Sequence, residues 1–397
     1  MSAAKLPPQS WAAEPAAAAL LETLGAAADE VRMVGGAVRD ALLGLASADI
    51  DLATVHPPDE VIRRAEAAGL KAVPTGIEHG TVTVIAGGRP FEVTTLRRDV
   101  STDGRRATVA FTHDWREDAA RRDFTMNALY ARPLTGEVVD LFGGTDDLAR
   151  GCVRFIGDAA ARIAEDHLRI LRFFRFHARF GRRAPDPEGL AACVARRNDL
   201  MAISRERVRD ELMKLLAVAD PAPTVELMIA GRVLEPVLPE LRDVAALAAL
   251  LRAEAAAVGA ETPPALAVSP LRRLAALLPA DAATLERVAH RLRLSTAERK
   301  RLAATALRCG ALPDSVSELA YWHGPEIAAD LWLLAGRAPQ ALAALSAWIR
   351  PKLPLSGGDL IAAGMAPGPA VAARLKRIEE RWVASGFELG RAELMGG

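Results

Sequence analysis

Several features that would narrow the class of this 397-residue chain are scarce in its sequence. Its three cysteines, Cys152, Cys193 and Cys309, are isolated, so the sequence predicts neither a disulfide framework nor a zinc site. The N-terminus has no basic segment followed by an unbroken apolar run, so we expect neither a signal peptide nor a membrane-spanning helix there. These absences favour a protein of the reducing cytoplasm without a membrane partner.

The chain also lacks an excess of charge of either sign. Lys and Arg total 50, as do Asp and Glu, so the formal net charge at pH 7 is zero. A neutral chain has no global field that attracts a polyanion, so any nucleic acid must meet a local basic patch. The histidines lack the companions of a metal site, which argues against a metal phosphohydrolase domain. No fixed-period repeat occurs, so a solenoid is not expected.

The texture of the sequence changes near Gly151. Before it, short β-like runs alternate with glycine turns, and the runs 81–85 and 91–95, joined by a Gly-Gly-Arg-Pro turn, predict a hairpin. After it, Ala-, Leu- and Arg-rich stretches have helical periodicity. Proline-rich breaks between these stretches lie at 221–223, 263–264 and 351–358. We therefore expect an α/β part followed by an all-helical part, in a chain long enough for about two or three domains.

The strongest functional signal is the segment 34–44. An apolar run breaks at Gly35 and Gly36 into a short predicted helix, where unpaired backbone N–H groups and the helix dipole favour a phosphate. Arg39 follows one helical turn after Gly36, so we expect its guanidinium to return toward the same anion.

A predicted strand with two aspartates follows at 49–54. Residues two apart in a strand point to the same face, so Asp49 and Asp51 would present their carboxylates together. Mg²⁺ is typically held by carboxylates together with substrate phosphate oxygens. A lone Asp-x-Asp is more often part of a solvated loop, but its position directly after the glycine turn favours phosphoryl chemistry.

Three segments of the N-terminal half accompany this unit. Residues 97–115 include Asp103-Gly104-Arg105-Arg106 and predict a mobile basic loop, either functional or simply solvated. In 121–129, apolar residues would anchor the segment while Arg122 binds a triphosphate, although the segment alone also fits an ordinary capped helix start. Residues 140–148 predict a strand end, a tight turn and a helix start with a connecting role.

The segment 165–179 is predicted to be a helix with an arginine face. A charge stripe is commonly a solvated surface, but planar guanidinium forks suit phosphates and base edges. Asp166 precedes Arg169 by one turn, so the carboxylate can accept from an exocyclic amino group while the guanidinium donates to a ring nitrogen. Cytosine and adenine offer that pair, whereas uracil and guanine would leave unpaired groups costing about 1–3 kcal/mol each. The arginines, which span about a third of the circumference, are Arg169, Arg172, Arg175 and Arg179.

The order of these segments resembles the class II nucleotidyltransferases, which comprise CCA-adding enzymes and bacterial poly(A) polymerases. GGAVRDALLG with DIDLAT is similar to the first catalytic motif of the family, RRDFTMNAL to the second and EDHLRILRFFRF to the nucleobase-selecting motif. Residues 140–148 and 204–212 are similar to two further motifs, so the resemblance covers roughly the first 220 residues. Residues 354–360 and 364–369 resemble, more weakly, a C-terminal segment expected to contact tRNA.

The resemblance implies an α+β fold class for the N-terminal part, a polymerase-β-like nucleotidyltransferase head, followed by an all-α neck, body and tail. The implied ranges are an N-terminal extension with a helix at 1–29, the head at 30–150, a neck with the nucleobase-selecting helix at 151–220, and a tRNA-binding body and tail at 221–397.

The resemblance also implies residue roles. Asp49 and Asp51 would be catalytic and hold Mg²⁺, with Glu92 as a third acidic ligand. Asp166 and Arg169 would read the base, supported by Arg172 and Arg175. The full implied nucleotide-binding set is Gly35, Gly36, Arg39, Arg122, Asp166, Arg169, Arg172 and Arg175.

The implied activity is template-independent addition of C, C and A to the 3′ end of tRNA from CTP and ATP, with release of pyrophosphate. A poly(A) polymerase is the nearest alternative, and the absence of an arginine-rich GRRF-type segment between Asp51 and Arg121 favours CCA addition. A non-catalytic RNA-binding module is a further alternative, but it gives no reason for the aspartates and the Asp166/Arg169 pair to occur together. The sequence does not predict the oligomeric state.

Overall fold

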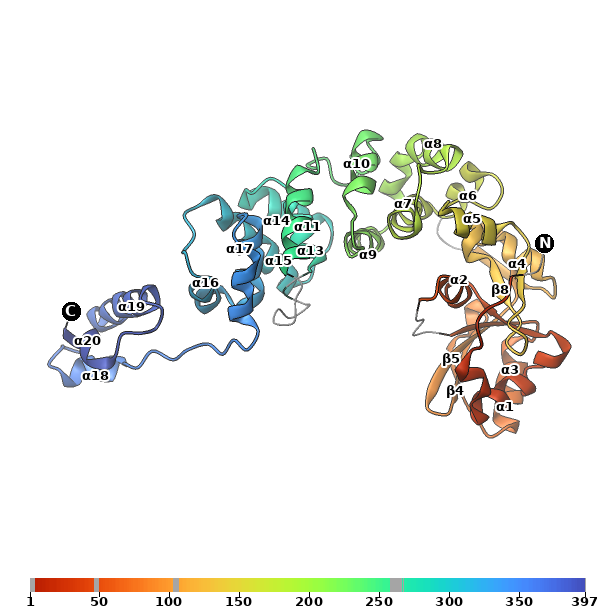
Figure 1. Cartoon of the computed structure of the whole chain (residues 1–397), viewed down its shortest axis with the longest axis horizontal. Coiled ribbons are helices and arrows are strands. Elements are labelled where there is room, and N and C mark those ends of the chain that lie inside the picture. The colour runs from red at the N-terminus through yellow and green to blue at the C-terminus, as the bar shows by residue number, and fades with distance from the viewer. Residues whose placement is uncertain (1–3, 46–49, 103–106, 258–265, 267, 397) are drawn as a thin grey trace. The chain divides into compact units, whose positions relative to one another are not determined.

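The computed structural model describes residues 4–45, 50–102, 107–257, 266 and 268–396 (Figure 1). The chain divides into two compact units. The first consists of Met1–Ser204 with Gly231–Pro236, and the second of Arg205–Ala230 with Val237–Gly397.

A seven-stranded mixed sheet forms the centre of the first unit, in the order β3-β4-β5-β2-β1-β8-β9. Only β2 and β5 pair in parallel, and the other neighbours pair antiparallel. β1 consists of three apolar residues and Arg32, and all four are buried in the middle of the sheet. The strands are β1 (Val31–Val34), β2 (Asp51–Thr54), β3 (Lys71–Gly76), β4 (Thr81–Ala86), β5 (Arg89–Thr95), β8 (Leu129–Ala131) and β9 (Val138–Asp140).

The predicted β4–β5 hairpin is confirmed. Its two turn residues, Gly87 and Gly88, have φ values of 60° and 79°, which only glycine adopts at little cost. Residues of β4 alternate between buried and half-buried, so one face of the hairpin packs into the core. The helices α1 (Pro15–Thr23) and α3 (Pro58–Ala67) contact β4 (Figure 1).

The predicted basic loop at 97–115 is wrong for its described part. Strands β6 (Arg97–Thr102) and β7 (Ala107–Phe111) pair antiparallel as a separate two-stranded sheet. The prediction gave weight to polar residues and overlooked the β-branched residues on both sides of Asp103-Gly104, a dipeptide typical of tight hairpin turns. Residues 103–106 themselves lie outside the described part.

Helices complete the first unit. The strand end, tight turn and helix start predicted for 140–148 are confirmed, since Asp140 ends β9, α5 begins at Gly144, and the Asp140 carboxylate accepts from the backbone N–H groups of Gly144 and Thr145. The helical elements are η1 (Ser10–Ala13), η2 (Ala26–Ala28), α2 (Gly36–Leu42), η3 (Ile77–His79), α4 (Trp115–Ala120), η4 (Thr125–Asn127), α5 (Gly144–Arg150), α6 (Ala159–Glu165), α7 (Arg169–Phe180), α8 (Pro187–Ala195) and η5 (Arg197–Ala202).

An aromatic cluster packs α7 against the segment that contains Phe124. The ring of Phe124 lies 4.9 Å from that of Phe155, 5.2 Å from that of Phe176 and 6.3 Å from that of Phe173, measured between centroids. Phe124, Phe155, Phe173 and Phe176 are all buried. Apolar burial of this kind contributes roughly 1.5–3 kcal/mol per phenylalanine, so α7 is firmly attached beside residues 121–127.

The second unit is helical throughout its described residues, which confirms the predicted fold class of an α+β part followed by an all-α part. Five helices begin at a Ser or Asp N-cap whose side chain accepts a backbone N–H, namely those capped by Ser269, Asp281, Ser295, Ser315 and Ser356. Across the described residues, no helix has both the length and the apolar character needed to cross a membrane.

The helical elements of this unit are α9 (Arg205–Leu216), α10 (Ala222–Ala230), α11 (Ala245–Ala257), α13 (Pro270–Ala276), α14 (Ala282–Arg291), α15 (Thr296–Ala304), η6 (Thr305–Cys309), α16 (Val316–His323), α17 (Pro325–Leu334), η7 (Pro339–Leu345), α18 (Gly357–Ala362), α19 (Pro369–Ala384) and α20 (Arg391–Gly396).

Candidate functional site

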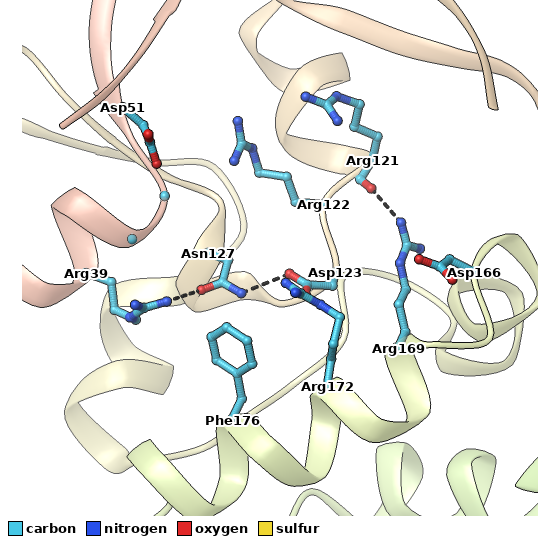
Figure 2. A pocket seen from close by; sticks show the side chains of 12 residues that line it. Arg39, Asp51, Arg121, Arg122, Asp123, Asn127, Asp166, Arg169, Arg172 and Phe176 are labelled. Atoms are coloured by element: carbon cyan, nitrogen blue, oxygen red, sulfur yellow. Dashed lines mark hydrogen bonds and ion pairs between the residues drawn. The ribbon is translucent and has the colours of Figure 1, made fainter. Parts of the chain in front are cut away.

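A polar cavity of about 370 Å³ opens in the first unit where α2, β2, residues 121–127 and the start of α7 meet (Figure 2). Five arginines and three aspartates contribute to its wall, so the cavity carries an excess of positive charge suited to a polyanion. The lining residues are Gly35, Gly36, Arg39, Asp51, Arg121, Arg122, Asp123, Asn127, Asp166, Arg169, Arg172 and Phe176.

The structure brings together eight of the residues expected from the sequence at this cavity: Gly35, Gly36, Arg39, Asp51, Arg122, Asp166, Arg169 and Arg172. Glu92 and Arg175 are not part of its wall. Asp49 lies outside the described residues. The predicted functional roles of all these residues stay predictions.

The turn between β1 and α2 leaves room for a ligand close to the backbone. Gly35 has φ 66° and ψ −121°, a conformation almost restricted to glycine. A Cβ added at Gly35 would lie 3.4 Å from Arg122 Nη1, and one added at Gly36 would lie 3.6 Å from Arg39 Nη2. The guanidinium groups of Arg39 and Arg122 therefore both approach the glycine pair, which suits the binding of an anion such as a phosphate.

Replacing Gly35 by alanine should weaken nucleotide binding and destabilise the protein by about 1–3 kcal/mol, because the backbone conformation is strained for any side chain and the new methyl group faces Arg122. Isothermal titration with CTP and a thermal melt would measure both effects. Gly69→Ala is the matched control, since Gly69 also has a positive φ of 74° but has no atom within 4 Å of an added Cβ. Equal CTP affinity in the two variants would contradict the expectation.

Two acidic side chains lie on neighbouring strands at one end of the sheet. Asp51 at the start of β2 is the register partner of Glu92 on the parallel strand β5, so both side chains point to the same face. Asp51 is half-buried and lines the cavity, whereas Glu92 is exposed. Nitrogen or sulfur donors from His or Cys are not part of this set, and carboxylate oxygens suit a hard divalent cation. Among the described residues, no group of three potential metal ligands occurs.

Arg122 is held in place by Asp118, a residue that the sequence analysis missed. Arg122 Nη2 donates to Asp118 Oδ2 at 3.0 Å, and Tyr130 Oη donates to the same oxygen at 2.6 Å. Burial by itself raises the pKa of Asp118, but Arg122 and Arg121 outweigh it and lower that pKa to about 2. Asp118 therefore remains charged and fixes Arg122 as a cation beside the glycine turn. The signal that was available is the i, i+4 spacing of Asp118 and Arg122.

Arg39 is more deeply embedded than the sequence suggested. Only 6% of the residue is exposed. Its Nε donates to Asp40 Oδ1 at 2.8 Å, its Nη1 donates to Asn127 Oδ1 at 2.6 Å, and its guanidinium lies 4.4 Å from the ring centroid of Phe180. Arg39 lines the cavity, and its neighbours fix the position of its side chain. The expectation from the sequence, that its guanidinium returns toward an anion, did not include these partners.

The continuous helix expected at 165–179 is interrupted. Helix α6 ends at Glu165, Asp166 is extended with φ −150° and ψ 106°, and α7 begins at Arg169. The break has a local cause, because Asp166 Oδ1 accepts the backbone N–H of Leu168 at 3.1 Å and competes with helical hydrogen bonding. Asp166 and Arg169 nevertheless both line the cavity (Figure 2).

The guanidinium of Arg169 is oriented by acceptors on both sides. Nη1 donates to Glu165 Oε2 at 2.6 Å, and Nη2 donates to the carbonyl oxygen of Arg121 at 2.9 Å. These contacts set the direction of a planar fork beside Asp166, as a hydrogen-bonding template for a base requires. Arg175, expected to support this pair, instead packs over the ring of Phe176 at 4.5 Å.

Comparisons with known proteins identify relatives of this chain. Residues 31–154 match the model described as the poly A polymerase head domain, and residues 184–244 match the model described as the probable RNA and SrmB-binding site of polymerase A. The crystal structure of the Bacillus stearothermophilus CCA-adding enzyme in complex with CTP superimposes with a TM-score of 0.71 and 29% identity, covering 96% of this chain and 98% of that chain. The chain is thus similar to CCA-adding enzymes, and residues 31–154 match the head domain of poly A polymerases.

Curated CCA-adding proteins are similar to this chain over about half of its length. The human mitochondrial CCA tRNA nucleotidyltransferase 1 is 45% identical over 190 residues, which are 47% of this chain and 44% of the human protein. The CCA-adding enzyme of Leuconostoc mesenteroides is 39% identical over 236 residues, 59% of this chain and 56% of that enzyme. The match thus spans about half the length of these relatives. Members of the nucleotidyltransferase family generally use a divalent metal ion.

Proposed function

We propose that this protein is a Mg²⁺-dependent nucleotidyltransferase that adds C, C and A to the 3′ end of tRNA from CTP and ATP and releases pyrophosphate. One observation carries the proposal: a single cavity combines a glycine turn flanked by two arginines, a carboxylate at a strand end and an Asp/Arg pair. Those parts match the three parts of a nucleoside triphosphate reaction, which are the phosphates, the reacting centre and the base. The names of the relatives and the CTP complex of the Bacillus stearothermophilus enzyme support the same activity.

The phosphate end of the cavity would bind and orient the triphosphate. The backbone of Gly35 and Gly36 permits close approach, and Arg39 and Arg122 would contact phosphate or ribose oxygens. Asp118 keeps Arg122 charged and in position, so little reorganisation is needed when the nucleotide binds.

The acidic side chains would hold the metal. Asp49 and Asp51 would bind Mg²⁺, with Glu92 beside Asp51 as a third acidic ligand. When bound, the ion supplies neutralisation of phosphate charge and alignment of the attacking and leaving oxygens. The bond that forms joins the 3′-hydroxyl oxygen to the α-phosphorus, and the bond that breaks releases pyrophosphate. The protein contributes mainly positioning and charge.

The opposite end of the cavity would select the base. Asp166 would accept from the amino group of cytosine or adenine while Arg169 donates to the neighbouring ring nitrogen. Arg172 would support this pair from the cavity wall, and Arg175 would do so from outside the wall, over the ring of Phe176. Uracil and guanine would place acceptor against acceptor and donor against donor, which leaves buried polar groups unpaired.

Product sequencing after incubation with tRNA that lacks its terminus tests the activity. Purified protein receives CTP and ATP together and separately, with generic RNA as a parallel substrate. We expect CCA on the truncated tRNA and little extension of generic RNA. Indifference to CTP, with ATP added to both RNAs, would identify a poly(A) polymerase. RNA retention without incorporation would identify a binding module.

The remaining proposals concern organisation. We propose that residues 1–29 form an N-terminal extension, 30–150 the head, 151–220 the neck and 221–397 the body and tail that bind tRNA. The RNA-binding model that matches residues 184–244 supports an RNA contact in that region. We also propose that the protein acts in the cytoplasm, as its isolated cysteines suggest.

Changing Asp166 to alanine should relax base choice more than it weakens triphosphate binding, because the acceptor for the amino group is lost while the glycine turn is intact. We expect the preference for CTP over UTP to fall by about 5- to 150-fold, from the roughly 1–3 kcal/mol cost of each unpaired group. The measurement is kcat/KM for each nucleotide on truncated tRNA. Asp158→Ala is the control, since Asp158 caps α6 away from the cavity. Unchanged selectivity in the Asp166 variant would contradict the template.

A further inference from the structure

Four polar side chains form a continuous chain of hydrogen bonds across the floor of the cavity (Figure 2). Arg39 Nη1 donates to Asn127 Oδ1 at 2.6 Å, and Asn127 Nδ2 donates to Asp123 Oδ1 at 2.9 Å. Arg172 Nε donates to Asp123 Oδ2 at 2.7 Å. The chain thus begins on α2, beside the glycine turn, and ends on α7, which carries the base-reading end of the site.

The side chains of this hydrogen-bonded row are buried enough for each hydrogen bond to have a defined donor and acceptor. Arg39, Asp123 and Asn127 are 6%, 7% and 8% exposed. The amide of Asn127 can serve this chain in one orientation only, with its oxygen toward the guanidinium of Arg39 and its NH₂ group toward the carboxylate of Asp123. The flipped amide would place donor against donor and acceptor against acceptor, which is costly in a site of low dielectric.

Helix α7 is attached to residues 121–127 and to α2 without these hydrogen bonds. The rings of Phe124, Phe155 and Phe176 already pack α7 against the same segment, and Asp40 on α2 contacts Arg179 on α7 at 3.4 Å. The hydrogen-bonded chain instead joins two cavity-lining arginines, one at each end of the site. The amide of Asn127 and the carboxylate of Asp123 are the two groups that link one guanidinium to the other.

We infer that Asn127 is a positioning residue that couples Arg39, at the triphosphate end of the cavity, to Arg172, at the base end, so that the correct base improves the placement of the triphosphate. This inference rests on the proposed function and specifies how its two ends cooperate. Asn127 acts through Arg39 and Asp123.

A mutant cycle in two backgrounds tests the coupling. Arg39→Lys, Arg172→Lys and the double variant are compared by kcat/KM for CTP on truncated tRNA. With Asn127 present, the loss in the double variant should be at least about threefold smaller than the product of the two single losses, a moderate coupling for groups in one network. In the Asn127→Ala background, the loss in kcat/KM of the double variant should equal the product of the two single losses, because the link between the arginines is removed. The inference would be overturned if the two losses in kcat/KM multiplied both with Asn127 and with Asn127→Ala. It would also be overturned if the double variant deviated from the product by the same factor in both backgrounds.

An exchange of the two central residues provides a second test that does not depend on the alanine variant. Asn127→Asp places two carboxylates side by side and should lower kcat/KM. Adding Asp123→Asn restores an amide donor beside a carboxylate and should recover at least about threefold of that loss. Failure to recover, with thermal melts showing both variants folded, would overturn the inference.

The outcome is separable from that of the proposed function. Incorporation of CTP by the wild-type protein tests the function alone. If the wild-type protein incorporates no nucleotide, the function fails, and the same cycle measured by CTP affinity still decides whether Asn127 couples the two arginines.

Discussion

Replacing Asp51 by asparagine should reduce nucleotide incorporation by about a thousandfold, because the variant keeps the shape of the side chain and removes the negative charge on which a metal ligand depends. Loss of several kcal/mol of transition-state stabilisation corresponds to a factor of this size. Asp51 stands at the first position of β2, half-buried and lining the cavity, so its charge is directed at the site. Single-turnover incorporation of CTP into truncated tRNA measures the loss.

The control for this variant is Asp59→Asn. Asp59 is exposed in the first turn of α3, so its replacement changes the net charge equally and should leave incorporation near the wild-type rate. Binding of tRNA by the Asp51 variant should persist in a filter-retention assay, because the change does not affect the helical unit. Incorporation within about threefold of wild type would contradict the proposed role of Asp51 as a metal ligand, since loss of a metal ligand should cost several kcal/mol.

Glu254→Ala should lower the free energy of unfolding of the helical unit by about 3–5 kcal/mol, the usual cost of breaking a buried ion pair. Glu254 on α11 accepts from Arg272 Nη1 at 3.1 Å and from Arg273 Nε at 2.7 Å. Arg272, Arg273 and Glu254 are 0%, 3% and 1% exposed. Without the carboxylate, two guanidinium groups on α13 remain buried, and Asp330 on α17 compensates only one of them, Arg272.

Hydrogen exchange of the amides of α11 and α13, together with urea unfolding, would measure this effect. Glu326→Ala is the matched control, because Glu326 pairs with Arg301 of the same network but its side chain is 59% exposed. An exposed pair contributes about 0–1 kcal/mol, so the control should unfold nearly as the wild type does. Equal exchange rates in the two variants would show that burial does not determine the strength of this network.

The extent to which the sequence predicted the site differs between its parts. Gly35, Gly36, Asp51, Arg122, Asp166 and Arg169 were predicted from local spacing, and they all line one cavity. Local spacing could not show that Asp118 holds Arg122, or that Asn127 lies between Arg39 and Asp123, since Arg39 and Asn127 are 88 positions apart. Helical periodicity also misjudged residues 166–168, where a side-chain hydrogen bond from Leu168 N–H to Asp166 outweighs helix propensity.

Local sequence by itself determined the β4–β5 hairpin, the change to an all-helical chain after Gly151 and the residue types that can bind phosphate and read a base. Period, turn chemistry and capping act over a few residues, so they can be recognised without a fold. Tertiary structure alone decided which of those residues face each other, which arginines are held by buried carboxylates and in which direction their donors point. The reason is physical: the orientation of a buried polar side chain is set by partners that are distant in the chain and that must satisfy every donor and acceptor removed from water.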